Sequence, residues 1–281
     1  MSIIKGSLYV VATPIGNVDD LSTRAINILS NVDIILAEDT RHSGRLLQKL
    51  GIRTTMLPYH DHNENKQIPS IVKRLKNGEV VAIISDAGTP LISDPGYSLV
   101  KAVHQAGLRV IPIPGPSALI GALSVAGQST DRFIFEGFLP AKKKARQDLL
   151  QALSTELRTL VFYEVPHRIM QSLEDMIQNF GSERGATLAK ELTKIHENII
   201  YGTLLEIKDW LLKDETRQKG EFVLIIEGTD KNTFDVHEAT RILQLLLQSL
   251  STKEAARIAS EMMQGHKNEL YQLALALKNK S

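Results

Sequence analysis

The chain has 281 residues, of which 43% are hydrophobic and 23% are charged. These values are ordinary for folded proteins and exclude a largely disordered or fibrous chain. Lys and Arg number 33 against 32 Asp and Glu, so the net charge of +1 creates no field that would by itself require nucleic acid or a membrane. With no cysteine in the chain, disulfides, thiolate-bound metals and a cysteine nucleophile are excluded.

The first residues do not have the pattern of an export signal. They lead directly into the apolar run 8–12 without a charged start and a long apolar stretch. Nowhere do about 18 apolar residues follow one another, which a membrane-spanning helix would need. We therefore expect neither export nor membrane insertion, and we expect a reducing cytoplasm as the location.

Short runs rich in Val and Ile alternate with helical patterns through the first 116 residues. Each run is too short for a buried helix and is predicted as a strand. The runs lie at 8–12, 32–37, 80–84 and 108–113. Because strands that are apolar on both faces and joined by helices build a parallel sheet covered on both sides, we predict an N-terminal α/β domain over residues 1–116.

A second series of apolar runs predicts a second α/β domain over residues 117–228. The runs lie at 133–138, 159–165, 186–192 and 222–226, with helices predicted over 142–153 and 167–180. Because residues 198–206 also have an extended pattern, we expect this sheet to be mixed.

The last segment, residues 229–281, has no strand pattern and is predicted as a small helical domain. Its three helices are expected over 236–250, 252–264 and 268–277. Ser251 and Glu254 form a capping-box pattern at the start of the middle helix, and Gly265 marks the turn after it.

Four loops after the strands of the first domain have unusual compositions, and ligands of open α/β sheets bind at such strand ends. The loops cover residues 12–17, 37–42, 85–96 and 112–118. None contains G-x-G-x-x-G or G-x-x-x-x-G-K-[ST], which argues against a dinucleotide fingerprint and a Walker phosphate site. Asp86 and Gly88 could receive a ligand with hydroxyl and ammonium groups, whereas Asp94 and Pro95 are more typical of a turn that starts a helix.

These loops, taken in order, resemble the successive motifs of the tetrapyrrole-methylase-fold superfamily. Within it, the chain is most similar to the bacterial 16S ribosomal RNA cytidine 2′-O-methyltransferases. Thr13-Pro14 and Ser85-Asp86-Ala87-Gly88-Thr89-Pro90 indicate the ribosomal branch, because tetrapyrrole enzymes carry Gly-rich and Gly-Asp-Pro versions there. Further matches are 59–64, 162–168, 190–194 and 220–222, and 251–257 is similar to that family's C-terminal helix-turn-helix.

The resemblance implies two α/β domains with S-adenosylmethionine in the cleft between them, and a homodimer. The implied acceptor is a cytidine ribose in 16S rRNA of the small ribosomal subunit, with the first loop facing the acceptor. Carried over position by position, the cofactor contacts would be Ile15, Asp86, Gly88, Thr89, Pro90, Ser117, Ala118, Tyr163, Leu192 and Phe222.

Methyl transfer to a ribose hydroxyl is an in-line displacement, so positioning is the main demand and a general base helps. The candidates for this acceptor side are Glu38, Asp39, Arg41 and Glu191, with His167 as a weaker one. Glu38 and Asp39 follow a strand in the expected cleft, and Arg41 would orient them or hold a phosphate. A salt-bridged helix start is the alternative for that group, while for Glu191 a functional and a structural role remain equally open.

The basic run Lys142-Lys143-Lys144-Ala145-Arg146 is our best candidate for a phosphate contact, with the solvated start of a helix as the alternative. The stretch His60-Asp61-His62-Asn63-Glu64 superficially resembles a metal site. Because spacing cannot supply its remaining ligands, we expect an acceptor-binding loop and no metal.

Two other functions remain open: a small-molecule methyltransferase acting on a tetrapyrrole-like substrate, and a non-catalytic ribosome-assembly protein that binds RNA. The helical tail is nearly balanced between basic and acidic residues. A motif that grips duplex phosphates is usually clearly basic, so we expect no DNA binding. Three other roles explain the tail better than DNA binding does: it docks to the ribosomal particle, it docks to the dimer partner, or it is a plain helical cap.

Overall fold

The computed structural model describes residues 3–229, 236–263 and 267–278. The chain forms two compact units. The first unit comprises Met1–Ala152 and Arg158–Glu227 and contains both β-sheets, while the second comprises Leu153–Leu157 and Gly228–Ser281. Every helix in the described ranges is too short or too polar to cross a membrane.

The first sheet has the strand order β3-β2-β4-β1-β5 and all its strand pairs are parallel. Its strands are β1 (Ser7–Val11), β2 (Ile34–Ala37), β3 (Met56–Pro58), β4 (Val81–Ile84) and β5 (Arg109–Ile113). Its helices are α1 (Thr23–Asn31), α2 (Thr40–Lys49), α3 (Glu64–Lys76) and α4 (Tyr97–Gln105), with a 3-10 turn over Val18–Asp20. The strand β3 was not predicted, because its three residues are too few to show a period.

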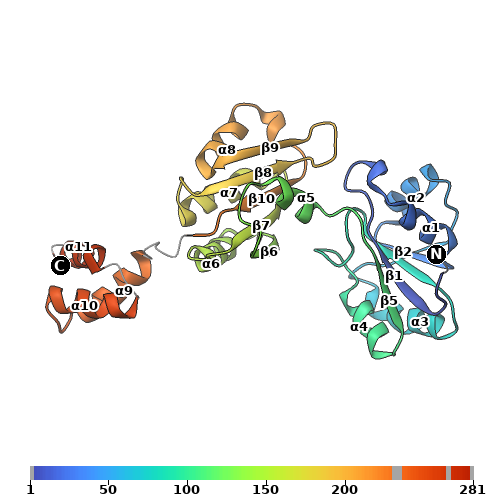
Figure 1. Ribbon diagram of the computed structural model, residues 1–281, viewed down its shortest axis with the longest axis horizontal. Coiled ribbons are helices and arrows are strands. Elements are labelled where there is room, and N and C mark those ends of the chain that lie inside the picture. Colours follow the sequence, from blue (N-terminus) through green and yellow to red (C-terminus); the bar gives the residue numbers. More distant parts are fainter. Residues whose placement is uncertain (1–2, 230–235, 264–266, 279–281) are drawn as a thin grey trace. The chain divides into compact units, whose positions relative to one another are not determined.

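Alternate residues of each strand in this sheet enter two separate cores. On β2, Ile35 packs with helices α1 and α2, whereas Leu36 packs with α3 and α4. Both residues are fully buried. Burial on both faces is the reason why these strands read as continuous apolar runs, and the expected covered parallel sheet is confirmed (Figure 1).

The second sheet has the order β6-β7-β10-β8-β9, and only the β6–β7 pair is parallel. Its strands are β6 (Phe133–Phe138), β7 (Thr159–Glu164), β8 (Gly185–Lys190), β9 (Asn198–Thr203) and β10 (Phe222–Ile226). Its helices are α5 (Ala118–Val125), α6 (Lys143–Leu153), α7 (Ile169–Phe180) and α8 (Leu204–Leu212), with a 3-10 turn over Glu215–Gln218. The mixed sheet is as expected, and α5 packs on the face that carries Val161, Ala189 and Val223.

The extended stretch expected over 198–206 ends earlier than predicted, at Thr203. The Thr203 hydroxyl accepts the backbone N–H of Glu206, and the Glu206 carboxylate accepts the backbone N–H of Thr203. This reciprocal capping box starts α8 at Leu204. The local cap therefore overrides the apolar alternation that continues beyond it.

The second unit contains α9 (Val236–Leu246), α10 (Thr252–Met262) and α11 (Lys267–Lys278). Helix α9 is four residues shorter than the expected 236–250. The Ser251 hydroxyl accepts the backbone N–H of Glu254, as the capping pattern predicts. A small core of alanines and leucines joins the three helices. Gly265, proposed as the turn after α10, lies outside the described residues.

Candidate functional site

A cavity of about 350 Å³ lies within the first unit and is lined by both sheets. The loops that follow β1, β2 and β4 contribute Ile15, Glu38, Asp86, Ala87, Gly88, Thr89, Ile92, Ser93 and Asp94. The second sheet, its loops and the start of α5 contribute Ser117, Ala118, Phe138, Tyr163, Glu164, Val165, Ala189, Leu192, Glu221, Phe222 and Val223. Its size is in the range of small-molecule sites.

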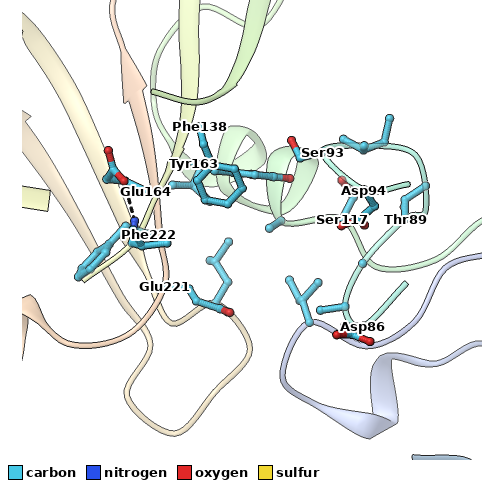
Figure 2. A pocket seen from close by; sticks show the side chains of 18 of the residues that line it. Asp86, Thr89, Ser93, Asp94, Ser117, Phe138, Tyr163, Glu164, Glu221 and Phe222 are labelled. Atoms are coloured by element: carbon cyan, nitrogen blue, oxygen red, sulfur yellow. Dashed lines mark hydrogen bonds between the residues drawn. The ribbon is translucent and has the colours of Figure 1, made fainter. Parts of the chain in front are cut away.

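The two sides of this cavity differ in chemistry (Figure 2). Asp86, Thr89 and Asp94 lie on the side of the first sheet, and the aromatic rings of Tyr163 and Phe222 lie on the other side. Polar groups that converge on an apolar wall are typical of cofactor and substrate sites.

A second hollow, of about 1120 Å³, lies beside the beginning of β1 and β5 and includes Arg24, His104 and Arg109. It is larger than the cavity between the sheets. We nevertheless assign the chemistry to the smaller cavity, because ligands of parallel sheets bind at the carboxyl ends of the strands.

Most of the residues that we predicted for the cofactor line this cavity. All of them do so except Pro90, which is buried in the same loop. Of the acceptor-side candidates, Glu38 lines the cavity, whereas Asp39, Arg41 and Glu191 do not. The structure thus brings together residues that are far apart in the sequence.

The loop 85–96 is held in an unusual conformation. Leu91 and Ser93 have φ angles of 73° and 67°, and each left-handed non-glycine residue costs about 1–3 kcal/mol. Gly88 makes two backbone hydrogen bonds with Thr13, at N···O distances of 2.8 and 3.0 Å. The Thr89 hydroxyl donates to the carbonyl of Pro116 at 3.0 Å. Such strain persists where surrounding contacts enforce it, and it concentrates at functional sites.

Three of the carboxylates that line the cavity, Glu38, Asp86 and Asp94, come from loops of the first sheet. Burial raises the pKa of Asp94 to about 6, with an opposing hydrogen bond to Ser85 and a further raising effect from Asp86. Burial, followed by the charges of Asp86 and Asp94, also raises the pKa of Glu38. Carboxylates with raised pKa values in a cleft are candidates for proton transfer.

The Asp39 carboxylate has a structural task at the start of α2. One of its oxygens accepts the backbone N–H groups of Arg41 and His42 at 2.7 and 3.3 Å. These two hydrogen bonds are the main reason why the pKa of Asp39 is lowered. The side chain of Arg41 is exposed at the same helix start. Asp39 therefore caps the helix start, but among the described residues Arg41 forms no ion pair with Glu38 or Asp39, so the salt-bridged helix start that we weighed as the alternative is present only as a cap.

Glu191 braces the loop between β8 and β9. Its carboxylate pairs with the Lys194 ammonium at 2.8 Å and accepts the backbone N–H of Glu221 at 2.8 Å. Burial opposes ionisation, but these hydrogen bonds lower the pKa of the Glu191 carboxyl. A paired carboxylate of lowered pKa is a weak proton acceptor. The neighbouring Thr193 accepts the backbone N–H of Asn17 at 3.1 Å, which ties this loop to the loop after β1.

Glu164 lines the cavity, but its oxygens are already occupied. They accept the Arg168 guanidinium at 2.9 and 3.0 Å, the Ser172 hydroxyl and the backbone N–H of Val165. The Arg168 guanidinium is therefore paired with Glu164. The group positions the loop after β7.

The histidine-rich stretch 60–64 also has internal partners. The Asn63 side-chain amide lies 3.1 Å from Nε2 of His60, and the Glu64 carboxylate accepts the hydroxyls of Tyr59 and Ser98. Within residues 3–229, 236–263 and 267–278, no three His, Asp or Glu side chains are grouped so that they could hold a metal ion.

Sequence reasoning missed two prominent lining residues. Asp94 reads as a helix-start residue because Pro95 and Gly96 follow it, and the sequence contains no sign that it would be half-buried in a cavity. Phe138 reads as the last core residue of a strand, but it is 48% exposed at the cavity. Asp94 lies within the loop 85–96 that resembles a family motif, and Phe138 ends a predicted strand, but neither position by itself marks a residue of the cavity.

Comparisons with known proteins identify the family of this chain. The family model described as "Tetrapyrrole (Corrin/Porphyrin) Methylases" matches residues 7–208, and that described as "RsmI C-terminal HTH domain" matches residues 235–278. "Ribosomal RNA small subunit methyltransferase I" of Pseudomonas aeruginosa is 51% identical, covering 98% of this chain and 99% of its own. The protein of the same name from Haemophilus influenzae is 50% identical, with the same coverage of both chains.

Among solved structures, uroporphyrin-III C-methyltransferase from Thermus thermophilus, complexed with "S-adenyl homocysteine", has a TM-score of 0.54 at 14% identity. The match covers 79% of this chain and 97% of that one. At this identity the likeness shows the fold alone.

Proposed function

This chain belongs to the tetrapyrrole methylase family, and from that premise we propose that it transfers a methyl group from S-adenosylmethionine to a cytidine ribose 2′-hydroxyl in 16S rRNA. Relatives named as small-subunit ribosomal RNA methyltransferases, matched over nearly their full length, support this choice within the family. The proposed methyl transfer rests on the cavity, in which the loops after β1, β2 and β4 meet the apolar wall of the second sheet.

The residues of the cavity fit the proposed cofactor. Asp86 and Thr89 offer polar groups for its ammonium and hydroxyl groups, and Ser117 lies beside them at the start of α5. Leu192, Phe222 and neighbouring apolar side chains offer a surface for its adenine. When bound, S-adenosylmethionine supplies a methyl carbon on a sulfonium, which a ribose oxygen can attack in line.

We propose Asp94 as the group that accepts the hydroxyl proton. As the hydroxyl oxygen takes up the methyl group that the bound cofactor would supply, leaving the neutral thioether, the Asp94 carboxylate would accept the proton that this oxygen loses. Asp94 lines the cavity together with Phe138 and Tyr163 of the second sheet. With a pKa of about 6, Asp94 is ionised at neutral pH and is a stronger base than an ordinary carboxylate. Glu38 stays a proposed acceptor-side residue.

The test offers methyl-labelled S-adenosylmethionine to small ribosomal subunits purified from cells that lack the gene. Label in the ribose of a cytidine of 16S rRNA is the expected result. Label that enters only a small tetrapyrrole-like molecule would indicate the rival methyltransferase, and no label in either acceptor would indicate a non-catalytic RNA-binding protein. Either of these results would contradict the proposal.

We also propose that the protein is a homodimer, as its family resemblance implies. The outer side of α5 supports this, because Ile120 and Val125 are 54% and 53% exposed there. Sedimentation should give twice the mass of the chain, and Val125→Glu, which places a charge on this side, should shift the protein toward monomers. A monomeric wild-type protein at micromolar concentration would contradict the proposal.

A further inference from the structure

Strand β6 carries a bulge at the point where it reaches the cavity. Phe135 is paired with Val161 on β7, but the next pair is Gly137 with Phe162, which leaves Glu136 as an extra residue. Gly137 has a φ of 68°, in the left-handed region that glycine adopts without strain. Bulges of this kind redirect the side chains that follow them and are frequent beside active sites.

The bulge determines which way Phe138 faces. In a regular strand, residues three apart lie on opposite faces, so Phe135 and Phe138 would point in opposite directions. Here both rings contact the Tyr163 ring, at centroid distances of 4.8 and 5.6 Å. The extra residue therefore moves Phe138 from the far face of the sheet to the cavity.

Phe138 is held at the cavity but is not covered by the protein. Its contact with Tyr163 is edge-on, at 64° between the ring planes, and the Tyr163 oxygen is itself fixed by the backbone N–H of Leu119 at 3.1 Å. With 48% of Phe138 exposed, a large part of the side chain remains available. A phenyl ring exposed at the edge of a binding cavity is suited to stack on a flat ligand.

The segment after Phe138 is anchored so that two lysines follow it on the surface. The buried Arg146 pairs with Asp175 at 2.7 Å and donates to the carbonyls of Pro140 and Ala141. Arg146 is therefore unavailable as a surface contact of the basic run, and Lys144 pairs with Asp148. Lys142 and Lys143 are exposed, and neither has a carboxylate partner among the residues that the structure describes.

We propose that Phe138 is the stacking surface for the base of the acceptor nucleotide, and that Lys142 and Lys143 bind phosphates of the same strand. This inference rests on the proposed function. A ribose whose hydroxyl enters the cavity brings its base to the cavity edge, and proteins hold unstacked RNA bases on aromatic rings flanked by cationic side chains. Lys142 is four residues from Phe138, at most about 14 Å between Cα atoms, which is within reach of a flanking phosphate.

The test for stacking compares side chains at position 138 by steady-state methylation of small subunits. Phe138→Ala and Phe138→Leu should raise KM for the subunit by at least about tenfold, since a stacked base contributes substantially to RNA affinity. Phe138→Trp should keep the KM for the subunit near the wild-type value, because stacking needs a flat ring, whereas leucine supplies only apolar volume. Affinity for S-adenosylmethionine should be unchanged. Phe133→Ala is the matched control, because Phe133 begins the same strand, is 37% exposed and does not line the cavity.

Several outcomes would overturn the assignment. If Phe138→Leu behaved like the wild type, the ring would serve packing alone. If Phe138→Ala lost cofactor affinity and kept KM for the subunit, the ring would belong to the cofactor. If the wild-type protein left the subunits unlabelled, the proposed function itself would be wrong. This result is distinct from a failure of the stacking assignment, which would appear only in the Phe138 variants.

The lysines have a test of their own. Lys143→Gln should weaken subunit binding and lower its salt dependence, whereas Lys144→Gln, whose lysine is already paired with Asp148, should change both much less. Equal effects of the two substitutions would remove Lys143 from the proposed RNA contact.

Discussion

The two sheets contribute to the same cavity in different ways. The first sheet is wholly parallel, so its strand ends meet at one edge and bring Glu38, Asp86 and Asp94 together. The second sheet is mixed and contributes mainly a wall, with Tyr163 and Phe222 from its strands and Phe138 from a bulge. One sheet thus supplies reactive groups through its topology, and the other supplies the shape of the cavity through a local irregularity.

Removing the proposed proton acceptor of the first sheet should have the largest effect. Asp94→Asn should lower kcat by about a hundredfold to ten-thousandfold, the usual contribution of a general base. Because the carboxylate must be ionised, wild-type kcat should fall as pH decreases through about 6, and the variant should lose this acid limb. The measurement is kcat against pH with saturating subunits.

Asp39→Asn is the matched control for this substitution. Asparagine caps helices about as well as aspartate, so a carboxylate that only caps α2 can be replaced with little change in kcat. A large loss in Asp39→Asn, together with an unchanged Asp94→Asn, would reverse the roles of the two residues.

Cofactor affinity should depend on the loop after β4 and on the start of α5. Asp86→Ala removes a polar group of the first sheet, and Ser117→Tyr fills space at the start of α5. Each should weaken S-adenosylmethionine binding by at least about tenfold, or roughly 1.4 kcal/mol, in a calorimetric titration. Ser124→Tyr, on the exposed side of the same helix, should leave the affinity unchanged. Unchanged affinity in folded Asp86→Ala and Ser117→Tyr proteins would move the cofactor elsewhere.

The bulge of the second sheet can be tested through its glycine. Gly137→Ala should lower the free energy of unfolding by about 1–2 kcal/mol because of its left-handed φ, as measured by urea denaturation. It should also raise KM for the subunit, because an added Cβ would lie 3.3 Å from the Ser93 hydroxyl and disturb the strand end.

Gly51→Ala separates these two effects. Its φ is 71° and an added Cβ would meet nothing within 4 Å. We expect a similar loss of stability and no change in methylation. If Gly137→Ala likewise left methylation kinetics unchanged, the bulge would have no role in substrate binding.

Ending the chain at Thr229 should have the smallest effect on cofactor binding. Every lining residue lies between Ile15 and Val223, so S-adenosylmethionine affinity should match that of the full chain. Methylation of small subunits should fall through a higher KM, if the helical tail docks the enzyme on the particle. Full activity would rule out docking, and failure to bind the cofactor would favour a helical cap.

Four of the five strands of the first sheet, and the loops that follow them, were predictable because their signals are local or topological. Buried strands are apolar throughout, and parallel topology places residues 38 and 86 at one edge without any knowledge of packing. The resemblance to a family added Tyr163, Leu192 and Phe222, which no pattern of this sequence would have associated with residues in the first sheet.

The remaining features depend on tertiary contacts that leave no periodic signal. Asp94 has the sequence context of a helix start, and its raised pKa arises from burial among groups that are distant in the chain. Glu191 looks reactive in sequence, but its pairing with Lys194 depends on a left-handed turn, with a φ of 52° at Glu191 itself. The bulge at Glu136 shifts register by one residue, which alternation alone does not reveal.

The most direct measurement for the central claim is a crystal structure with S-adenosylhomocysteine bound. We predict that the ligand occupies the cavity between the two sheets, with its polar groups against residues 86–89 and Ser117, its adenine against the second sheet, and its sulfur facing Asp94. Two results would contradict the claim that the first sheet supplies the reactive groups and the second sheet the wall of the cofactor site. One is a ligand in the hollow beside Arg24 and Arg109. The other is a ligand whose sulfur faces away from Asp94 and Glu38.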